Sequence, residues 1–448
     1  MKFSVIFFLF ILPVYGFAQE DEQREALANQ FIEYLDKKEF NKAFDIFDSN
    51  IVLLPNAVIL ERMWDGILLH SGHFQGTYKT TPISLAGNSF VIVTCNFEKT
   101  SLDFKASFSP DFKINNIVFL PSKREEDYNP PDYVKRRKFR EKEIYFKAGD
   151  FLIPGTLTLP KCGRKLPLVV LVHGSGPMDR DNSVGPNKMF KDIAWGLSSK
   201  KIAVIRYDKR TYLYAAKISE YYGNRFTINE EIVADALAAA TFGKTIKKIN
   251  PERIYIAGHG LGGTVAPRIA GMRPDLAGII VMAGCARPYE DLILEQVRSL
   301  GRLPAVNGVD SEPIPFQRLE RQVAMVKNPL LNVETPSSEL PLNLSPYYWL
   351  DLNNYNQIAS ARNVKVPILF LQGEKDKQVT VNDFKIWSDG LKKVKQAHFK
   401  LYNNLGHYFI EGSEGQENLN EYTNPGSVPL NVVIDMVRWI KKNPKKHL

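Results

Sequence analysis

A histidine and an aspartate in the last quarter of the chain are residue types that acyl transfer uses. His407 stands in segment 404–408, just after the last apolar strand-like run, and Asp376 follows the run 368–371. Acyl transfer from an ester needs a nucleophile, a base, an acid that orients the base, and donors for the oxyanion. We therefore predict that His407 is the base and Asp376 the orienting acid.

Two other carboxylates lie close to Asp376 in the sequence. Glu374 stands two residues earlier, and Asp383 falls inside the next helical segment. A strand followed by Gly-x-x-Asp and then Val379 is the usual arrangement around such an acid, so the pattern favours Asp376.

The position where this chemistry would place its nucleophile holds a glycine. Residues 258–263 (GHGLGG) follow the apolar run 254–257 and lead into a helical pattern that includes Val265 and Ile269. The order strand, G-x-S-x-G, helix is typical of a sharp turn that exposes a catalytic serine. Gly260 occupies the serine position, and without a hydroxyl no acyl-enzyme forms by the ordinary route.

Backbone N–H groups near this turn are the expected donors to the oxyanion. One is Leu261, the residue after the nucleophile position, and the other is Ser175 in segment 173–177 (HGSGP). The glycines of that segment allow a substrate oxygen to approach the backbone closely.

Two charged segments also follow predicted strands. Residues 179–181 (DRD) and 206–210 (RYDKR) bring several opposite charges to the same end of the sheet. We predict a salt-bridge network that holds these two loops together and includes Asp235. Binding of a charged substrate group is the alternative.

Gly260 leaves four hypotheses about function open. The chain hydrolyses esters through a water molecule that His407 and Asp376 activate, or it is inactive and binds a ligand or partner. A third hypothesis makes Ser175 or Cys285 the nucleophile, although neither stands at the turn. A fourth takes the match to G-x-G-x-x-G as a dinucleotide site, but the next strand ends without the acidic residue that such a site needs.

Strands that alternate with helices position these residues from about residue 141 onward. Predicted strands cover 143–146, 155–159, 168–172, 203–207, 254–257, 278–282, 368–371 and 399–401, and predicted helices cover 190–198, 230–246 and 262–270. Short continuous apolar runs are typical of strands buried on both faces. The pattern predicts an α/β fold with a mostly parallel sheet flanked by helices. A proline-rich insertion at about 286–350 is expected to form a lid over the carboxyl ends of the strands.

The N-terminal third of the chain has a different organisation. Residues 1–18 combine a lysine, a short apolar run and small residues before Gln19, which is typical of a signal peptide. We therefore expect export to the periplasm or the exterior of a bacterium. Helical spacing followed by strand-like runs predicts a small α+β domain at 19–122. The proline-rich, charged residues 123–140 are a predicted linker to a second domain at 141–448.

Composition excludes several other classes of function. The chain has a formal net charge of +9, but its basic runs lack the aromatic residues and motifs of nucleic-acid readers. Three scattered cysteines, with no C-x-x-C or H-E-x-x-H motif, predict no disulfide framework, no metal and no cofactor.

After residue 18 no apolar run is long enough for stable membrane insertion. The expected partner is a small-molecule ester substrate or ligand, and no particular oligomeric state is predicted.

Taken together, several motifs carry a family likeness. They are residues 171–181 (LVHGSGPMDRD), 185–188 (GPNK), 206–211 (RYDKRT) and 371–376 (LQGEKD). Over most of residues 20–440 the chain resembles secreted bacterial α/β-hydrolases of the EstD-like esterase group. The resemblance implies an α/β-hydrolase fold, preceded by a small domain similar in kind to the cone-shaped SnoaL-type folds.

The resemblance also implies an activity, the hydrolysis of carboxylic esters of small acyl groups. Serine-peptidase-like hydrolysis is a further alternative, because the group shares its fold with serine aminopeptidases. In the group the turn carries Gly-His-Ser-x-Gly-Gly, so Gly260 implies weak or water-mediated hydrolysis.

Overall fold

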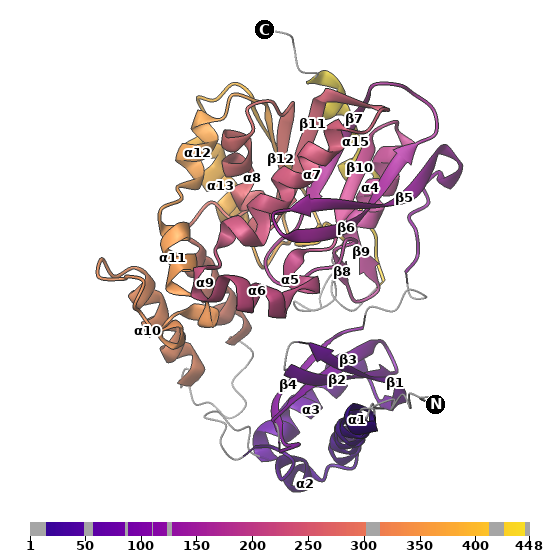
Figure 1. Cartoon of the computed structure of the whole chain (residues 1–448), viewed down its shortest axis with the longest axis vertical. Helices are drawn as coiled ribbons and strands as arrows, with labels where there is room; N and C mark the ends of the chain where they lie inside the picture. Colours follow the sequence, from indigo (N-terminus) through magenta and orange to yellow (C-terminus); the bar gives the residue numbers. More distant parts are fainter. Residues whose placement is uncertain are drawn as a thin grey trace, which may run out of the picture. The chain divides into compact units, whose positions relative to one another are not determined.

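The computed structural model divides the chain into two units, Met1–Ser122 and Lys123–Leu448. The described residues are 15–48, 57–85, 88–109, 111–122, 128–301, 314–411 and 425–443 (Figure 1). Most of the predicted signal peptide at 1–18 lies outside them.

In the N-terminal unit, helices precede an antiparallel sheet, in agreement with the predicted α+β class. The elements are α1 (Tyr15–Asp36), α2 (Phe40–Phe44), α3 (Ala57–Ser71), β1 (Phe74–Leu85), β2 (Asn88–Phe97), β3 (Ser101–Phe108) and β4 (Ile114–Pro121). The strands pair in chain order, and Phe31, Trp64 and Phe104 are buried in the core of this unit. Strand β1 and helix α3 were not predicted. Strand β1 contains Gly76 and Pro82, which an edge strand tolerates because one side of it is unpaired.

The second unit is built on an eight-stranded sheet that confirms the predicted fold class. Its strands are β5 (Phe139–Ala148), β6 (Phe151–Pro160), β7 (Leu166–Val172), β10 (Ala203–Tyr207), β11 (Ile249–His259), β12 (Gly278–Met282), β13 (Ile368–Gly373) and β14 (Ala397–Tyr402). They lie in the order β14-β13-β12-β11-β7-β10-β6-β5, and the six from β14 to β10 are parallel. In the register, Gly258 of β11 lies opposite both Val172 and Val281. The carboxyl ends of β7, β11 and β12 therefore meet at one edge.

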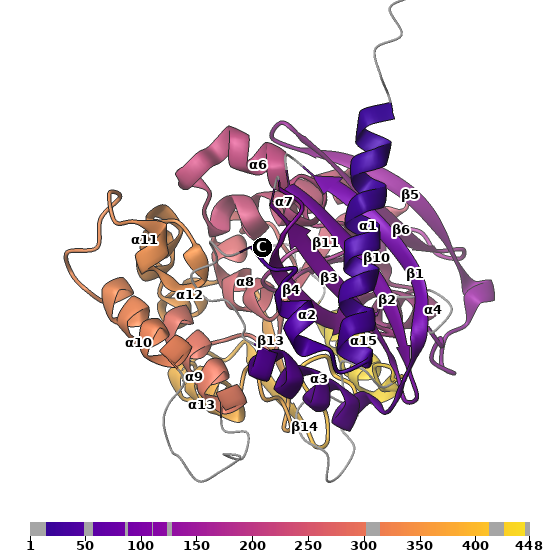
Figure 2. The same cartoon turned by 90° about the horizontal axis from the view of Figure 1, so that it is seen from below.

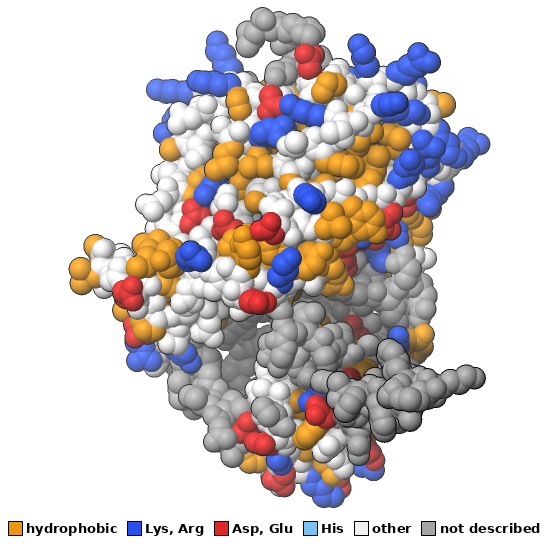
Figure 3. Space-filling model, in the orientation of Figure 1, with side chains coloured by type: hydrophobic (Ala, Val, Ile, Leu, Met, Phe, Trp, Pro, Cys, Tyr) orange, Lys and Arg blue, Asp and Glu red, His pale blue; other side chains and the backbone are white. Residues whose placement is uncertain are grey.

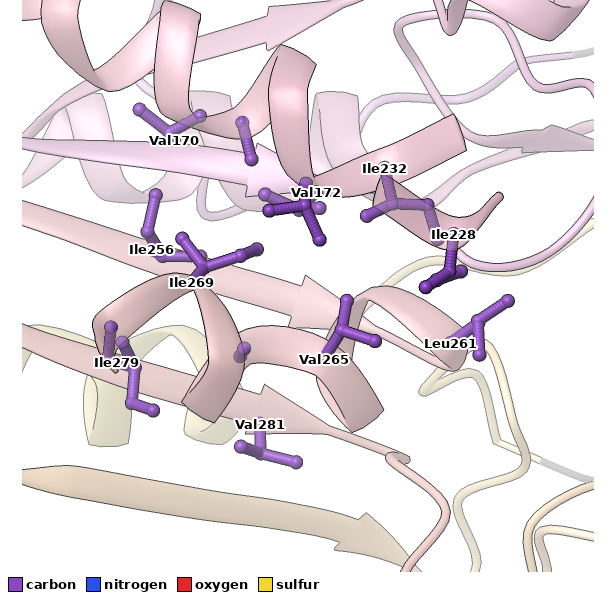
Figure 4. Close-up of a cluster of buried hydrophobic side chains, with 14 of the residues drawn as sticks. Val170, Val172, Ile228, Ile232, Ile256, Leu261, Val265, Ile269, Ile279 and Val281 are labelled. Carbon is purple, nitrogen blue, oxygen red and sulfur yellow. The ribbon is translucent and has the colours of Figure 1, made fainter. Parts of the chain in front are cut away.

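Helices cover both faces of this sheet (Figure 1; Figure 2). Helices α7 (Ala234–Lys244) and α8 (Leu261–Met272) pack on one face, and α4 (Met189–Ser199) and α15 (Leu430–Lys442) on the other. Figure 4 shows Val265 and Ile269 of α8 against Val170, Val172 and Ile256 of the strands. Neighbouring strand residues face opposite layers, so the strands are apolar on both faces.

The insertion after β12 is mainly helical. It contains α9 (Tyr289–Gly301), α10 (Ile314–Val326), α11 (Pro346–Asn353) and α12 (Gln357–Asn363) before β13 begins. Residues 302–313 lie outside the described residues. The helical insertion extends beyond residue 350, the end that the sequence predicted.

The segment predicted as a linker is partly structured. Strand β5 begins at Phe139, inside the predicted range 123–140. The Tyr128 hydroxyl donates to Asp192 Oδ1 at 2.7 Å, and the Tyr133 hydroxyl donates to the carbonyl of Val428 at 2.8 Å. These contacts join residues far apart in the sequence, which local composition does not reveal.

A group of basic residues lies at the end of the sheet where the parallel strands begin. Figure 3 shows lysine and arginine side chains gathered over the upper part of the second unit. Exposed residues there include Arg164 and Lys165 before β7, and Lys441 and Lys442 in the last turn of α15. Cations are favoured at helix C-termini by the helix dipole. Among the helices of the described ranges, none is long and apolar enough to cross a membrane.

The predicted salt-bridge network is confirmed. Arg180 pairs with Asp208 at 2.6 Å, and Arg206 pairs with Asp181 at 2.8 Å. Arg210 donates to both carboxylate oxygens of Asp235, and both side chains are almost completely buried. The first two pairs hold the loop after β7 against the end of β10 and the residue that follows it, and the third joins Arg210 to α7.

Removing one member of the buried pair should destabilise the second unit. Arg210→Met leaves the Asp235 carboxylate without its main partner, so we expect a loss of about 3–5 kcal/mol in the free energy of unfolding. The double change Arg210→Met with Asp235→Leu should recover most of that loss, because no buried charge remains. Urea titrations would measure both. Arg298→Met, which breaks an exposed pair with Glu320, is the control and should have little effect.

Candidate active site

The turn between β11 and α8 has the backbone shape of a nucleophile elbow. Gly260 has φ 54° and ψ −120°, and it stands directly before the first residue of α8. Its N–H donates to the carbonyl of Met282 at 2.9 Å, and its carbonyl accepts from the N–H of Thr264 at 2.9 Å. These bonds fix a sharp change of direction at the carboxyl edge of the sheet.

The glycines around the turn have different steric roles. A Cβ atom on Gly258 would lie 2.2 Å from the carbonyl oxygen of Gly262, and one on Gly262 would lie 2.3 Å from that of His173. A Cβ on Gly260 would make only ordinary contacts, 3.5 Å from Gly174 Cα and 3.6 Å from His407 Nε2. Close packing therefore requires glycine at 258 and 262, whereas position 260 has room for a side chain directed at His407.

His407 and Asp376 form the predicted pair. His407 Nδ1 and Asp376 Oδ2 are 2.9 Å apart, and both side chains are buried. Asp376 also accepts hydrogen bonds from the Gln372 amide and from the backbone N–H groups of Gln378 and Val379, at 2.8–2.9 Å. A carboxylate that accepts this many hydrogen bonds is fixed in place. It holds the Nδ1–H tautomer of His407 and leaves Nε2 as a proton acceptor toward Gly260.

The competing carboxylates do not contact His407. Glu374 is exposed on the surface. Asp383 is buried in the first turn of α13 (Val381–Gly390), where it pairs with Arg287 at 2.8 Å. Of these three carboxylates, Asp376 is the one that is hydrogen-bonded to the His407 ring.

His259 has a role that the sequence did not suggest. Its Nε2 donates to the carbonyl oxygen of His407 at 3.0 Å, which fixes the backbone of the loop after β14. Burial, together with the nearby His407, lowers the pKa of His259 well below its ordinary value. The ring therefore stays neutral and keeps one N–H for this bond. The sequence signal for this role was the turn motif G-x-S-x-G, in which His259 is the variable residue directly before position 260.

The predicted oxyanion donors flank Gly260. Leu261 is the first residue of α8, where a backbone N–H has no partner within its own helix. A Cβ built on Gly174 would lie 3.8 Å from Leu261 N, so the loop after β7 approaches the helix start. The Ser175 N–H belongs to the peptide bond between Gly174 and Ser175 in the same loop.

A cavity of about 150 Å³ contains these groups. It is lined by Gly174, Ser175, Met178, Asn182, His259, Gly260, Leu261, Thr264, Cys285, Tyr289, Leu292, Gln296, Gln378, Val379, His407 and Tyr408. Helix α9 supplies Tyr289, Leu292 and Gln296, so the insertion forms one wall. The volume of the cavity suits a small substrate group better than a large one.

Neither alternative nucleophile is activated. Burial and the nearby Asp383 carboxylate raise the pKa of the Cys285 thiol well above its ordinary value, so the thiolate is not available. Ser175 lies near the phenol of Tyr289, and burial raises the pKa of Tyr289 to about 12, so this phenol is not a base that could activate the serine. Within the described ranges, no group of three or more His, Cys, Asp or Glu side chains is placed to hold a metal ion.

The chain is similar to several characterised proteins. A family model described as serine aminopeptidase, S33, matches residues 167–414. Esterase EstD of Thermotoga maritima is 30% identical over 442 residues, which is 99% of this chain and 100% of the relative. Among solved structures, Est1E from Butyrivibrio proteoclasticus is 15% identical with a TM-score of 0.42, over 68% of this chain and 99% of its own. Pyrococcus horikoshii acylaminoacyl peptidase is 14% identical with a TM-score of 0.47, and the match covers 84% of this chain and 57% of the peptidase.

The parallel sheet, the strand–turn–helix at Gly260 and the histidine–aspartate pair define an α/β-hydrolase. The chain belongs to the serine aminopeptidase S33 family of α/β-hydrolases. The resemblance to EstD-like esterases is confirmed by the full-length relative.

The steric difference between the glycines gives a direct test of the turn. Gly258→Ala should destabilise the protein by more than about 3 kcal/mol, because its Cβ would overlap a backbone oxygen that cannot move away easily. Gly260→Ala should cost about 1–2 kcal/mol, the strain of positive φ alone. Chemical denaturation of the two variants measures the difference. Equal losses would contradict this account of the turn.

Buried, neutral His173 predicts sensitivity to acid. Its Nε2 donates to the carbonyl of Asp179 at 3.0 Å, and burial lowers the pKa of His173 to about 3. The unfolded chain takes up this proton at a pKa near 6.5. The stability that the group contributes is therefore present above about pH 6.5 and is lost as the pH falls.

In His173→Gln, the free energy of unfolding should fall less steeply with acid than in the parent. The expected difference is about 1.4 kcal/mol per pH unit between roughly pH 6 and pH 4. Denaturant titrations at several pH values would measure both slopes. The exposed His398→Gln change serves as control and should keep the parental slope, and a parental slope in His173→Gln would refute the prediction.

Proposed function

We propose that this chain binds carboxylic esters of small acyl groups and hydrolyses them slowly, with water as the nucleophile. The observation that carries the proposal is the position of His407 Nε2, which lies 3.6 Å from the point where a Cβ on Gly260 would stand. The base is thus aimed at the place where a serine hydroxyl would be, and a water molecule there is within its reach.

The proposed reaction follows from this geometry. Water beside Gly260 gives a proton to His407 Nε2 while its oxygen attacks the ester carbonyl carbon. The N–H groups of Leu261 and Ser175 stabilise the negative charge that develops on the carbonyl oxygen. The bond to the leaving group then breaks, and protonated His407 gives its proton to the departing alkoxide. The products are a carboxylic acid and an alcohol.

The rate should be low because covalent catalysis is absent. Removal of the nucleophile from a serine hydrolase typically leaves a residual ~10³–10⁴-fold acceleration over water, which comes from the oxyanion donors and binding. Those donors and the oriented base are the parts that this chain has.

The substrate class is supported by the cavity and by the full-length relative. The relative is named an esterase, and apolar side chains of Met178, Leu292 and Val379 line a space of about 150 Å³. Such a space suits a short acyl chain. Serine-peptidase-like hydrolysis of an amide is the minor alternative. An amide demands a better proton donor to its leaving group than an ester does.

Binding without turnover is the second candidate function. It is favoured by Gly260 itself, because the chain keeps the backbone of the elbow, with φ 54°, but places no hydroxyl on it. In this case the cavity binds an ester or a related ligand that is released unchanged.

Restoring the nucleophile tests the proposal. The parent chain should hydrolyse p-nitrophenyl acetate only slightly above background, and Gly260→Ser should raise kcat/KM by at least about 100-fold. Gly260→Ala controls for the added Cβ and should give no increase. His407→Ala should abolish the residual rate of the parent if water is the nucleophile, and should leave it unchanged if the parent only binds. No gain in Gly260→Ser would contradict the assignment of the site.

A further inference from the structure

Lys209 is a buried cation whose contacts the proposed reaction has not used. Its Nζ donates to the carbonyl oxygen of Gly174 at 2.7 Å, to that of Gly176 at 2.9 Å, and to Glu231. An ammonium group has three N–H bonds, so all of its donors are occupied. Lys209 does not line the cavity, whereas Gly174 and Ser175 do. It therefore holds the loop from behind.

The contact with Gly174 fixes the direction of a whole peptide. The carbonyl of Gly174 and the N–H of Ser175 belong to one planar unit, and no cis peptide is present among the described residues. In a trans peptide these two groups point in opposite directions. With the Gly174 carbonyl directed toward Lys209, the Ser175 N–H is directed away from it, toward the side of the loop that lines the cavity.

We propose that Lys209 is a positioning residue that orients the Gly174–Ser175 peptide so that the Ser175 N–H serves as an oxyanion donor. This inference rests on the proposed function, because it assigns that N–H a role in stabilising the substrate oxygen. Lys209 does not touch the substrate and acts only through the loop.

Further contacts make the same loop rigid. The backbone N–H of Lys209 donates to the carbonyl of Met178 at 3.0 Å, and Asp208 accepts from the backbone N–H of Arg180 at 2.7 Å. The loop after β7 is thus held at 174, 176, 178 and 180 by a few residues after β10. Donors held in place before the reaction cost no reorganisation when charge develops.

Glu231 joins this arrangement to the insertion after β12. It accepts from Lys209 and from the Tyr348 hydroxyl at 2.6 Å, and both Glu231 and Tyr348 are buried. Tyr348 belongs to α11. The acid compensates the buried charge of Lys209, so the pair is neutral overall and hydrogen-bonded on all sides.

Loss of the ammonium group should release the peptide. Without it, the carbonyls of Gly174 and Gly176 have no partner on the buried side, and rotation of the Gly174–Ser175 peptide would direct a carbonyl oxygen at the cavity. A carbonyl there repels the developing oxyanion instead of stabilising it. Removal of one oxyanion donor typically lowers kcat by ~10²–10³-fold.

The kinetic test uses the full chain with Gly260→Ser, so that turnover is measurable. Adding Lys209→Met should lower kcat for p-nitrophenyl acetate by ~10²–10³-fold and change KM by less than about threefold, because the donor acts in the transition state. Arg210→Met with Asp235→Leu is the matched control. It removes the neighbouring buried cation together with its acid, and this pair does not hold the loop after β7, so kcat should stay within about threefold.

A crystal structure of Lys209→Met provides a measurement that does not depend on turnover. The Gly174 carbonyl should have turned away from position 209. If Lys209→Met folds poorly, Lys209→Met with Glu231→Gln avoids the unpaired carboxylate and should show the same change. An unrotated peptide, or a kcat within threefold of that of Gly260→Ser alone, would overturn the proposal. If Gly260→Ser gives no turnover, the proposed function fails, and the orientation of this peptide still decides the role of Lys209.

Discussion

The turn at the carboxyl end of β11 is the constraint on which the rest of the site depends. Gly258 and Gly262 pack against backbone oxygens so closely that a Cβ on either would overlap them. This packing brings the start of α8 against the loop after β7, and it sets the positive φ of Gly260. Position 260 therefore faces His407 whatever side chain it carries, because the backbone around it is fixed by its neighbours.

The consequence is that the residues of the proposed site are held in fixed positions. Asp376 accepts several hydrogen bonds and orients the ring of His407. His259 holds the backbone carbonyl of His407, and Leu261 is the first residue of α8, where its N–H has no partner within the helix. Burying a carboxylate is costly unless it is hydrogen-bonded, and here those bonds are made. In the proposed function, the absence of a hydroxyl at Gly260 limits the chemistry rather than the fold.

Buried charges at the same edge of the sheet serve the loops around the site. Lys209 and Arg210 are adjacent in the sequence, yet Lys209 binds the loop after β7 through Gly174 and Gly176, whereas Arg210 pairs with Asp235 of α7. Each cation is matched by an acid, as buried charges require. The charged run after β10 is therefore part of the structural support of the cavity, and it is not available to bind a charged substrate.

The sequence by itself determined the alternation of strands and helices, the turn at Gly260, and the pairing of His407 with Asp376, because each depends on short apolar runs and local motifs. It did not determine β1, which carries several polar residues as well as Gly76 and Pro82 and pairs with β2 along its length. It also did not show that Tyr128 binds Asp192, that His259 holds His407, or that Lys209 holds the loop after β7. Such contacts join residues between about 30 and 150 positions apart in the sequence. They form only in the folded unit, where the sheet brings its strand ends to one edge and helices such as α4 pack on its faces.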